Sequence, residues 1–442
     1  MTKDEFDNLL ATPSLFDAGG KLLIENRKVY RVVKDSARIN LYNTLINSPN
    51  YNDLLKLGLV STKIIEKYSS DTCLILNHEY IPYILNPSEY TNMMFWEASY
   101  KFVTLCKELY INHGALLFDA HPWNITYNGS DFKFFDFTSI YKGDSISDSW
   151  MNEFETYFIL PLVLASSKKV NSDMSGLYRR EHVKGLGISL KREGVFRKII
   201  NYKRPSFFKF SNQPEIFFSK LLDYIKNLKS IKAKQEYWNN YEQAHLAEIS
   251  EPKTVKQQFV YTIIKEKQPF KVLDLACNKG FYSLMASHLG AQVAAFDYEE
   301  STIDICRQII NQEKGNVTVC QMDFNHPTPA SGVGLINRSS FDRFKSNIVL
   351  SLGLIHHICL RQSIPVSIFC NICLSYAKEG VILEFVDPND IHVQKWNINP
   401  PEDYTIESVK KYFSCKFPKI KIEKIINDNG VNRSLLFFSK DI

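Results

Sequence analysis

Three acidic side chains in the C-terminal half of the sequence follow apolar runs at regular points. Asp274 lies at the end of the run 271–275, Asp297 ends the run 292–297, and Asp323 follows the third run. A short loop of small residues separates the first acid from a helical stretch, so a ligand can approach the backbone and the helix N-terminus there. A carboxylate after the second run can accept both hydroxyls of a ribose, and one after the third can meet an adenine amino group. The spacing therefore predicts a pocket for a nucleoside.

Apolar strands alternate with helical stretches over residues 251–442, and this pattern predicts an α/β fold with a parallel sheet. A helix is expected over 282–289, with Gly290 as its end. The last two strands should form an antiparallel pair around a turn at 427–430. The predicted strands are 271–275, 292–297, 317–322, 347–352, 381–385, 420–426 and 434–439.

The sequence from about residue 260 to the end resembles the class I S-adenosylmethionine-dependent methyltransferases. Their first loop reads acid-x-Gly-x-Gly-x-Gly, and here Gly280 stands at the last of the three glycine positions. The resemblance implies a Rossmann-like seven-stranded sheet and S-adenosylmethionine as the cofactor. It also implies a set of cofactor-binding residues: Asp274, Ala276, Asn278, Gly280, Phe281, Asp297, Asp323 and Leu352.

Candidate catalytic residues follow the fourth and fifth strands of this zone. In the resembling family the end of the fourth strand faces the methyl group, so His356 or His357 is a candidate general base. The alternative is that one of the pair packs under the cofactor as a core histidine. Glu384 ends the fifth strand, where it either binds substrate or caps a loop. A domain for NAD or FAD is disfavoured because the sequence has no G-x-G-x-x-G, while a nucleotide fold with an inactive site remains open.

The N-terminal zone, residues 1–150, contains a second constellation: Asp119, then Asn124 five residues later, then Asp136 after an apolar strand. It resembles the catalytic loop and metal-binding segment of protein kinases. That resemblance implies an α+β kinase-like domain in which Asp119 receives a hydroxyl proton. Asn124 and Asp136 would hold magnesium only if the domain is active.

This zone also departs from the kinase pattern. Thr138 stands where kinases have glycine, and no glycine-rich phosphate loop precedes the constellation. Lys34 could serve as the nucleotide-clamping lysine, although an exposed strand lysine is favoured. These departures favour a degenerate kinase-like scaffold. Bacterial methyltransferases with this layout are associated with nodulation or surface-glycan gene sets, which favours a glycan or small-molecule hydroxyl as the unidentified methyl acceptor.

Residues 151–250 form the third zone, a predicted basic helical connector. Residues 168–234 hold 17 Lys and Arg against 5 Asp and Glu, interleaved with aromatic residues. Such a stretch can bind RNA or a phosphorylated substrate, but nucleic acid is not the favoured partner. The favoured interpretation is solvated helix faces whose aromatic side chains, such as Phe207 and Phe208, belong to the core.

Composition limits the class of protein. The 442 residues are 45% hydrophobic and 23% charged, which excludes a largely disordered or fibrous chain. The nine cysteines are scattered, so reduced thiols in a cytoplasmic protein are expected. Cys370 and Cys373 form a CxxC in an apolar run and are predicted to be buried helix thiols. We expect no signal peptide and no membrane span, because the longest apolar stretch, 157–165, is too short.

The leading hypothesis is a methyltransferase that uses S-adenosylmethionine on an unidentified acceptor. The first alternative is a bifunctional kinase and methyltransferase. The second is an RNA-binding adaptor with a vestigial catalytic domain.

Overall fold

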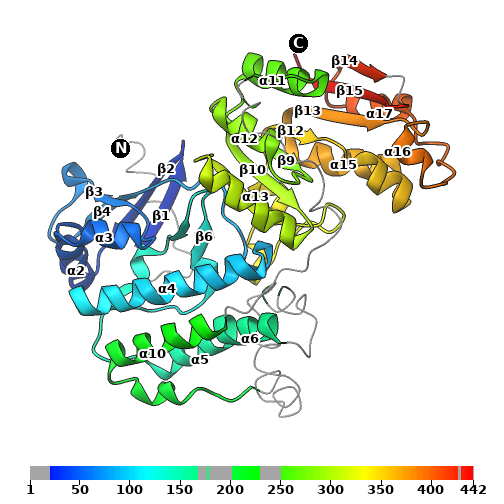
Figure 1. The fold of residues 1–442 in the computed structure, drawn as a ribbon. Helices are drawn as coiled ribbons and strands as arrows, with labels where there is room; N and C mark the ends of the chain where they lie inside the picture. The colour runs from blue at the N-terminus through cyan, green and yellow to red at the C-terminus, as the bar shows by residue number, and fades with distance from the viewer. Residues whose placement is uncertain are drawn as a thin grey trace. The chain divides into compact units, whose positions relative to one another are not determined.

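The structure is a computed structural model that describes residues 20–167, 176, 179, 202–228, 249, 251–426 and 430–441. The chain forms two compact units (Figure 1). Unit 1 comprises Met1–Tyr127 and Asp131–Lys232, and unit 2 comprises Asn128–Ser130 and Ala233–Ile442. The boundaries at 150 and 250 stay predictions. In the structure, the described helices of the connector zone belong to unit 1.

Unit 1 begins with a four-stranded antiparallel sheet in the order β1-β2-β4-β3. Its inward-facing residues, including Tyr30, Val32 and Ile75, form a small apolar core. Two pairs of short antiparallel strands, β5 with β8 and β6 with β7, flank the candidate residues of this unit in the sequence. The strands of unit 1 are β1 (Gly20–Glu25), β2 (Lys28–Val33), β3 (Thr62–Ile64), β4 (Leu74–His78), β5 (Ala115–Leu117), β6 (Ile125–Tyr127), β7 (Phe132–Phe134) and β8 (Ile140–Lys142).

The longest helix of unit 1 is α4 (Asn92–His113), and its ends are explained by its flanking residues. The Thr91 side chain accepts a hydrogen bond from the Met94 amide at the start, and Gly114 adopts a left-handed conformation at the end. The other helices of this unit are α2 (Ser36–Ile46), α3 (Tyr51–Lys56), α5 (Asp148–Phe154), α6 (Leu160–Ser166) and α10 (Pro214–Asn227).

The connector zone contributes core to unit 1. Helix α10 packs along α4, and Phe207 and Phe208 are buried beside Phe217. Lys203 and Arg204 are exposed. For the described residues, the structure therefore confirms the interpretation of core aromatics with solvated basic side chains. The basic residues at 180, 191–192 and 197–198 lie outside the described residues.

Unit 2 is built around a seven-stranded sheet in the order β11-β10-β9-β12-β13-β15-β14. The first five strands in that order are parallel, and β15 pairs antiparallel with both β13 and β14. The strands are β9 (Lys271–Leu275), β10 (Gln292–Asp297), β11 (Val317–Gln321), β12 (Ser346–Ser351), β13 (Ala377–Val386), β14 (Lys419–Ile426) and β15 (Asn432–Ser439). All seven predicted strands are present. Residues 427–429 of the predicted turn at 427–430 lie outside the described residues.

Helices pack on this sheet in two groups (Figure 1). Helix α12 packs on β9, β10 and β11 and contacts α11, whereas α15 packs on β12 and β13 and contacts α17. Parallel strands bring their carboxyl ends to one edge, so the predicted site residues lie along that edge. The helices are α11 (Val255–Lys267), α12 (Phe281–His288), α13 (Glu300–Gln312), α14 (Ser340–Arg343), α15 (Val366–Tyr376), α16 (Ile391–Gln394) and α17 (Ile406–Ser414).

Two further expectations concern burial and the membrane. Cys370 and Cys373 are buried in α15, which confirms them as core thiols. None of the helices in the described ranges combines the length and apolar character needed to cross a bilayer.

Candidate functional site

The loop between β9 and α12 adopts an unusual backbone conformation at all three motif positions. Ala276 (φ 59°), Asn278 (φ 49°) and Gly280 (φ 82°) all lie in the left-handed region. Only glycine adopts this region freely, and asparagine tolerates it better than alanine. A Cβ on Gly280 would also lie 2.6 Å from the Cys306 Sγ. The loop thus keeps the backbone shape of a glycine-rich turn although two of its three glycines are replaced.

Asp274 is buried in β9 beneath this loop. Its Oδ2 accepts a hydrogen bond of 2.6 Å from the Ser283 hydroxyl on α12. Burial raises its pKa to about 7, and the Ser283 hydrogen bond and the Lys256 charge only partly oppose this effect. In the described part of the chain Asp274 has no ion-pair partner, so its negative charge is poorly compensated.

Asp297 ends β10 and holds the same loop from the other side. Its two oxygens accept the Asn278 and Glu299 amides, each at 3.1 Å. Burial raises its pKa to about 6, against the lowering effect of these backbone hydrogen bonds. The carboxylate is thereby fixed where an acidic group could accept ribose hydroxyls, and it too has no ion-pair partner among the described residues.

The remaining predicted cofactor residues lie at the same edge but differ in exposure. Phe281 begins α12 and Leu352 follows β12, and both are buried. Asp323 is exposed and lies two residues beyond the end of β11, which ends at Gln321, one residue earlier than predicted. Its carboxylate bonds to His326 Nδ1 at 2.7 Å and to the Asn325 amide. A polar turn residue favours this local bonding over continuing the strand.

The two histidines after β12 form an aromatic cluster with Trp396. The His356 ring stacks on Trp396 at a centroid distance of 5.5 Å, and the His357 ring lies 5.1 Å from the same ring. Burial lowers the pKa of His356 to about 3 and that of His357 to about 4. Both imidazoles are therefore neutral near pH 7. His356 is buried and its Nδ1 has no hydrogen-bond partner among the described residues, whereas His357 is partly exposed.

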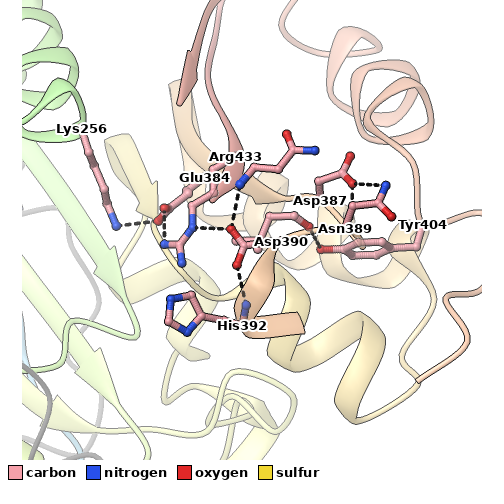
Figure 2. A network of polar contacts seen from close by, with 10 residues as sticks. Lys256, Glu384, Asp387, Asn389, Asp390, His392, Tyr404 and Arg433 are labelled. Carbon is pink, nitrogen blue, oxygen red and sulfur yellow. Dashed lines mark hydrogen bonds and ion pairs between the residues drawn. The ribbon is translucent and has the colours of Figure 1, made fainter. Parts of the chain in front are cut away.

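Glu384 is the centre of a buried charge network rather than an open carboxylate (Figure 2). Its Oε2 lies 2.5 Å from Lys256 Nζ and its Oε1 lies 3.0 Å from Arg433 Nη1. Arg433 also donates through Nε to Asp390 Oδ2 at 3.1 Å. Burial alone would raise the pKa of Glu384, but the two cations hold it at about 2. A carboxylate with both oxygens paired is a poor proton acceptor, which argues against a direct role in proton transfer.

Sequence reasoning missed several residues of this edge: Lys256, Tyr298, Trp396 and Arg433. Local signals existed for two of them. Thr254 and Gln257 form a capping box that marks the start of α11 and so places Lys256 in its first turn. Tyr298 directly follows the second acid and is 58% exposed, so its ring is available to a flat ligand. No local pattern singles out Trp396 or Arg433.

Unit 1 contains its own cavity, of about 660 Å³. Asp119, Asn124 and Asp136 all line it, so the structure brings together the three residues of the second constellation. Burial, with the nearby Asp136, raises the pKa of Asp119. Within the described ranges no group of three His, Cys, Asp or Glu side chains is arranged to hold a metal ion.

The cation that meets Asp136 is Arg31 of β2. Its Nη1 lies 3.4 Å from Asp136 Oδ1 and also contacts the Thr138 hydroxyl, which donates to the same carboxylate oxygen at 3.0 Å. Lys34 is exposed, as favoured from the sequence. Thr138, which departs from the kinase pattern, thus has a role in holding the carboxylate.

Three comparisons relate the chain to known proteins. Residues 250–336 match the family model described as "Tellurite resistance protein TehB". Over 393 residues the chain is 24% identical to the nodulation protein NoeA of Rhizobium meliloti (strain 1021), covering 83% of this chain and 82% of that protein. It is also 24% identical over 136 residues to the "O-antigen chain terminator bifunctional methyltransferase/kinase WbdD" of Escherichia coli, covering 31% of this chain and 18% of that one.

Among solved structures, magnesium protoporphyrin IX methyltransferase (ChlM) from Synechocystis PCC 6803, with bound SAH, matches at 15% identity and a TM-score of 0.33. The match covers 46% of this chain and 91% of that chain. TehB from Haemophilus influenzae matches at 17% identity and a TM-score of 0.31, covering 44% and 65%.

Proposed function

We propose that this chain, which is a class I S-adenosylmethionine-dependent methyltransferase, methylates a hydroxyl group of a saccharide. The enzyme class and the cofactor are those expected from the sequence, and the matches to TehB, NoeA and WbdD confirm them. The acceptor and the roles of individual residues are our proposal.

One observation supports the cofactor-binding residues most strongly: two acids without an ion-pair partner among the described residues, the buried Asp274 and the partly buried Asp297, flank a loop with a glycine-like backbone. A ligand with positive charge and ribose hydroxyls is suited to such a site, since it supplies both charge and donors to Asp274 and Asp297. Asp297 would accept the ribose hydroxyls, and the N-terminal turn of α12 would lie close to the ligand. Ala276, Asn278, Gly280, Phe281, Asp323 and Leu352 complete the proposed cofactor site.

In this reaction the cofactor supplies an activated methyl group on a sulfonium, so the protein chiefly has to align the acceptor. The partly exposed His357 is the better candidate to accept a proton from the acceptor hydroxyl. His356 would accept a hydrogen bond through its unpartnered Nδ1. Glu384 is a catalytic candidate from the sequence. We propose it as a positioning residue, because both its carboxylate oxygens are paired with cations.

The saccharide acceptor is supported by the relatives. WbdD is described as an O-antigen chain terminator, and NoeA as a nodulation protein. The neutral aromatic surface of Trp396 beside the two uncharged histidines also suits an uncharged ring with polar edges.

The test is methyl transfer from labelled cofactor to an extract separated into glycans, small metabolites, RNA and protein. We expect label in the glycan fraction, and no label with the Asp297→Asn variant. Label in RNA or protein instead would refute the acceptor class. Absence of both transfer and cofactor binding would refute the cofactor site itself.

A second candidate function is supported by the cavity of unit 1. Asp119, Asn124 and Asp136 line it together, and WbdD is described as a methyltransferase and kinase. In this proposal unit 1 is kinase-like and binds a nucleotide, with Arg31 in place of the clamping lysine. Asn124 and Asp136 would hold the magnesium ion.

Magnesium-dependent binding of ATP, measured by calorimetry, tests this candidate. We expect it to be lost in Asp136→Ala and kept in Lys34→Ala, because Lys34 is exposed and does not line the cavity. Failure of the wild-type protein to bind ATP would leave unit 1 as an inert scaffold.

A further inference from the structure

We infer that Lys256 binds the α-carboxylate of the cofactor's amino-acid group and makes the site select for a carboxylate-bearing cofactor. The inference rests on the proposed cofactor site. It adds a recognition residue that no sequence pattern indicated, on a helix that precedes the first strand of the sheet.

The strand order gives the direction in which the cofactor must run. Asp297 and Asp274 belong to β10 and β9, and Asp323 follows β11 by two residues; β11, β10 and β9 are neighbours in that order. With the base and ribose at β11 and β10, the amino-acid part of a linear ligand must continue over β9 toward β12 and β13. The structure places Lys256 and Glu384 in that direction, since Glu384 lies in β13.

The Lys256 side chain is held in place and keeps hydrogen-bond donors for an anionic ligand. Its ammonium has three N–H donors, and Glu384 accepts one of them. The ammonium also lies 5.2 Å from the centre of the Tyr282 ring, and its side chain is 23% exposed. Two N–H donors of the Lys256 ammonium thus remain for a ligand. Because Glu384 and Tyr282 already hold the side chain in place, binding a ligand would cost little side-chain entropy.

The charge network keeps Lys256 in this position (Figure 2). Glu384 shares its carboxylate between Lys256 and Arg433, and Arg433 is held in turn by Asp390. Arg433 therefore already faces two carboxylates, whereas Lys256 faces one. Lys256 is accordingly the cation of this network with fewer anionic contacts. Its charge also opposes the burial-raised pKa of Asp274.

The competing cation is Lys279, which lies in the loop between Asn278 and Gly280. It makes an interaction of its own in the structure. A matched surface control is Lys253, which is exposed three residues before Lys256.

The experiment compares the binding of S-adenosylmethionine with that of its decarboxylated analogue, which keeps the sulfonium and the ammonium. Wild-type protein should prefer the intact cofactor by about 10- to 100-fold, the effect of one charge-assisted contact. In Lys256→Gln this preference should fall to near one, because the intact cofactor binds more weakly while the analogue is unaffected. Lys256→Arg should retain most of the preference.

The other outcomes separate this inference from the proposed function. Equal weakening of both ligands in Lys256→Gln, or loss of the preference in Lys279→Gln instead, overturns the role of Lys256. Lys253→Gln should leave both affinities unchanged. If the wild-type protein binds neither ligand, the cofactor site itself is wrong. Thermal unfolding of each variant checks folding, and Lys256→Arg decides the question if Lys256→Gln does not fold.

Discussion

The acids of unit 1 and unit 2 differ in how their charge is balanced. Asp136 in unit 1 already meets Arg31 and the Thr138 hydroxyl. Asp274 and Asp297 in unit 2 have no cation at ion-pair distance among the described residues, and burial raises the pKa of both. A buried acid without a partner costs stability unless a ligand compensates it. The difference indicates that Asp274 and Asp297 of unit 2 can pair directly with a cationic ligand. In unit 1, Asp136 would first have to give up its contact with Arg31.

The largest change in the free energy of unfolding should come from the charge network around Glu384 in unit 2. Glu384→Ala leaves Arg433 and Lys256 without their shared carboxylate, and we expect a loss of about 3–5 kcal/mol in unfolding free energy. Asp136→Ala in unit 1 should cost only about 1 kcal/mol, since that pair is partly exposed. Hydrogen exchange resolved by unit measures both. Equal losses in the two units would contradict the contrast.

The second largest effect should be on cofactor affinity, which a substitution in unit 2 should change and one in unit 1 should not. Asp297→Asn keeps the shape of the side chain but removes its charge, and we expect about 10- to 100-fold weaker binding of S-adenosylhomocysteine. Asp136→Asn should leave this affinity unchanged. Calorimetry provides the measurement, and an unchanged affinity in Asp297→Asn would exclude the ribose role.

The raised pKa values of unit 2 predict a pH dependence. The pKa of Asp274 is raised from 3.8 to about 7 and that of Asp297 to about 6, so the folded apo-protein retains protons that the unfolded chain releases. Their contribution to stability therefore falls as pH rises from about 4 to 7. A ligand that needs the ionised acids should bind about tenfold more tightly at pH 8 than at pH 6. Titrations across this range would detect it, with Asp274→Asn as the control that flattens most of the profile.

The smallest effect concerns the backbone of the loop. Ala276 occupies a left-handed conformation that glycine adopts without strain, so Ala276→Gly should stabilise unit 2 by up to about 1 kcal/mol. Cofactor affinity should change little. Denaturant unfolding compares the variant with Ala291→Gly, a change at a buried alanine with no positive φ, which should destabilise. A destabilised Ala276→Gly would show that the loop is not strained.

Much of unit 2 could be predicted because its signals are local. Each buried parallel strand is a short apolar run, and each acid falls at or near its end, so strand order in sequence placed Asp274 and Asp297 correctly. The strand before Asp323 ends one residue earlier than predicted, because a turn residue can bond to its own loop. The loop keeps the backbone conformation of a glycine-rich turn although Ala276 and Asn278 replace two glycines.

Sequence alone determined the α/β sheet of unit 2, its acids and the constellation of unit 1, because hydrophobic periodicity and turn residues act over a few positions. Tertiary structure decided which charges meet. Arg31 and Asp136 are 105 residues apart, and Lys256 and Glu384 are 128 apart. Such pairs depend on how whole elements pack, and the same residues would be ordinary surface charges in another arrangement. Glu384, expected from the sequence to bind substrate or cap a loop, is the centre of a buried charge network for that reason.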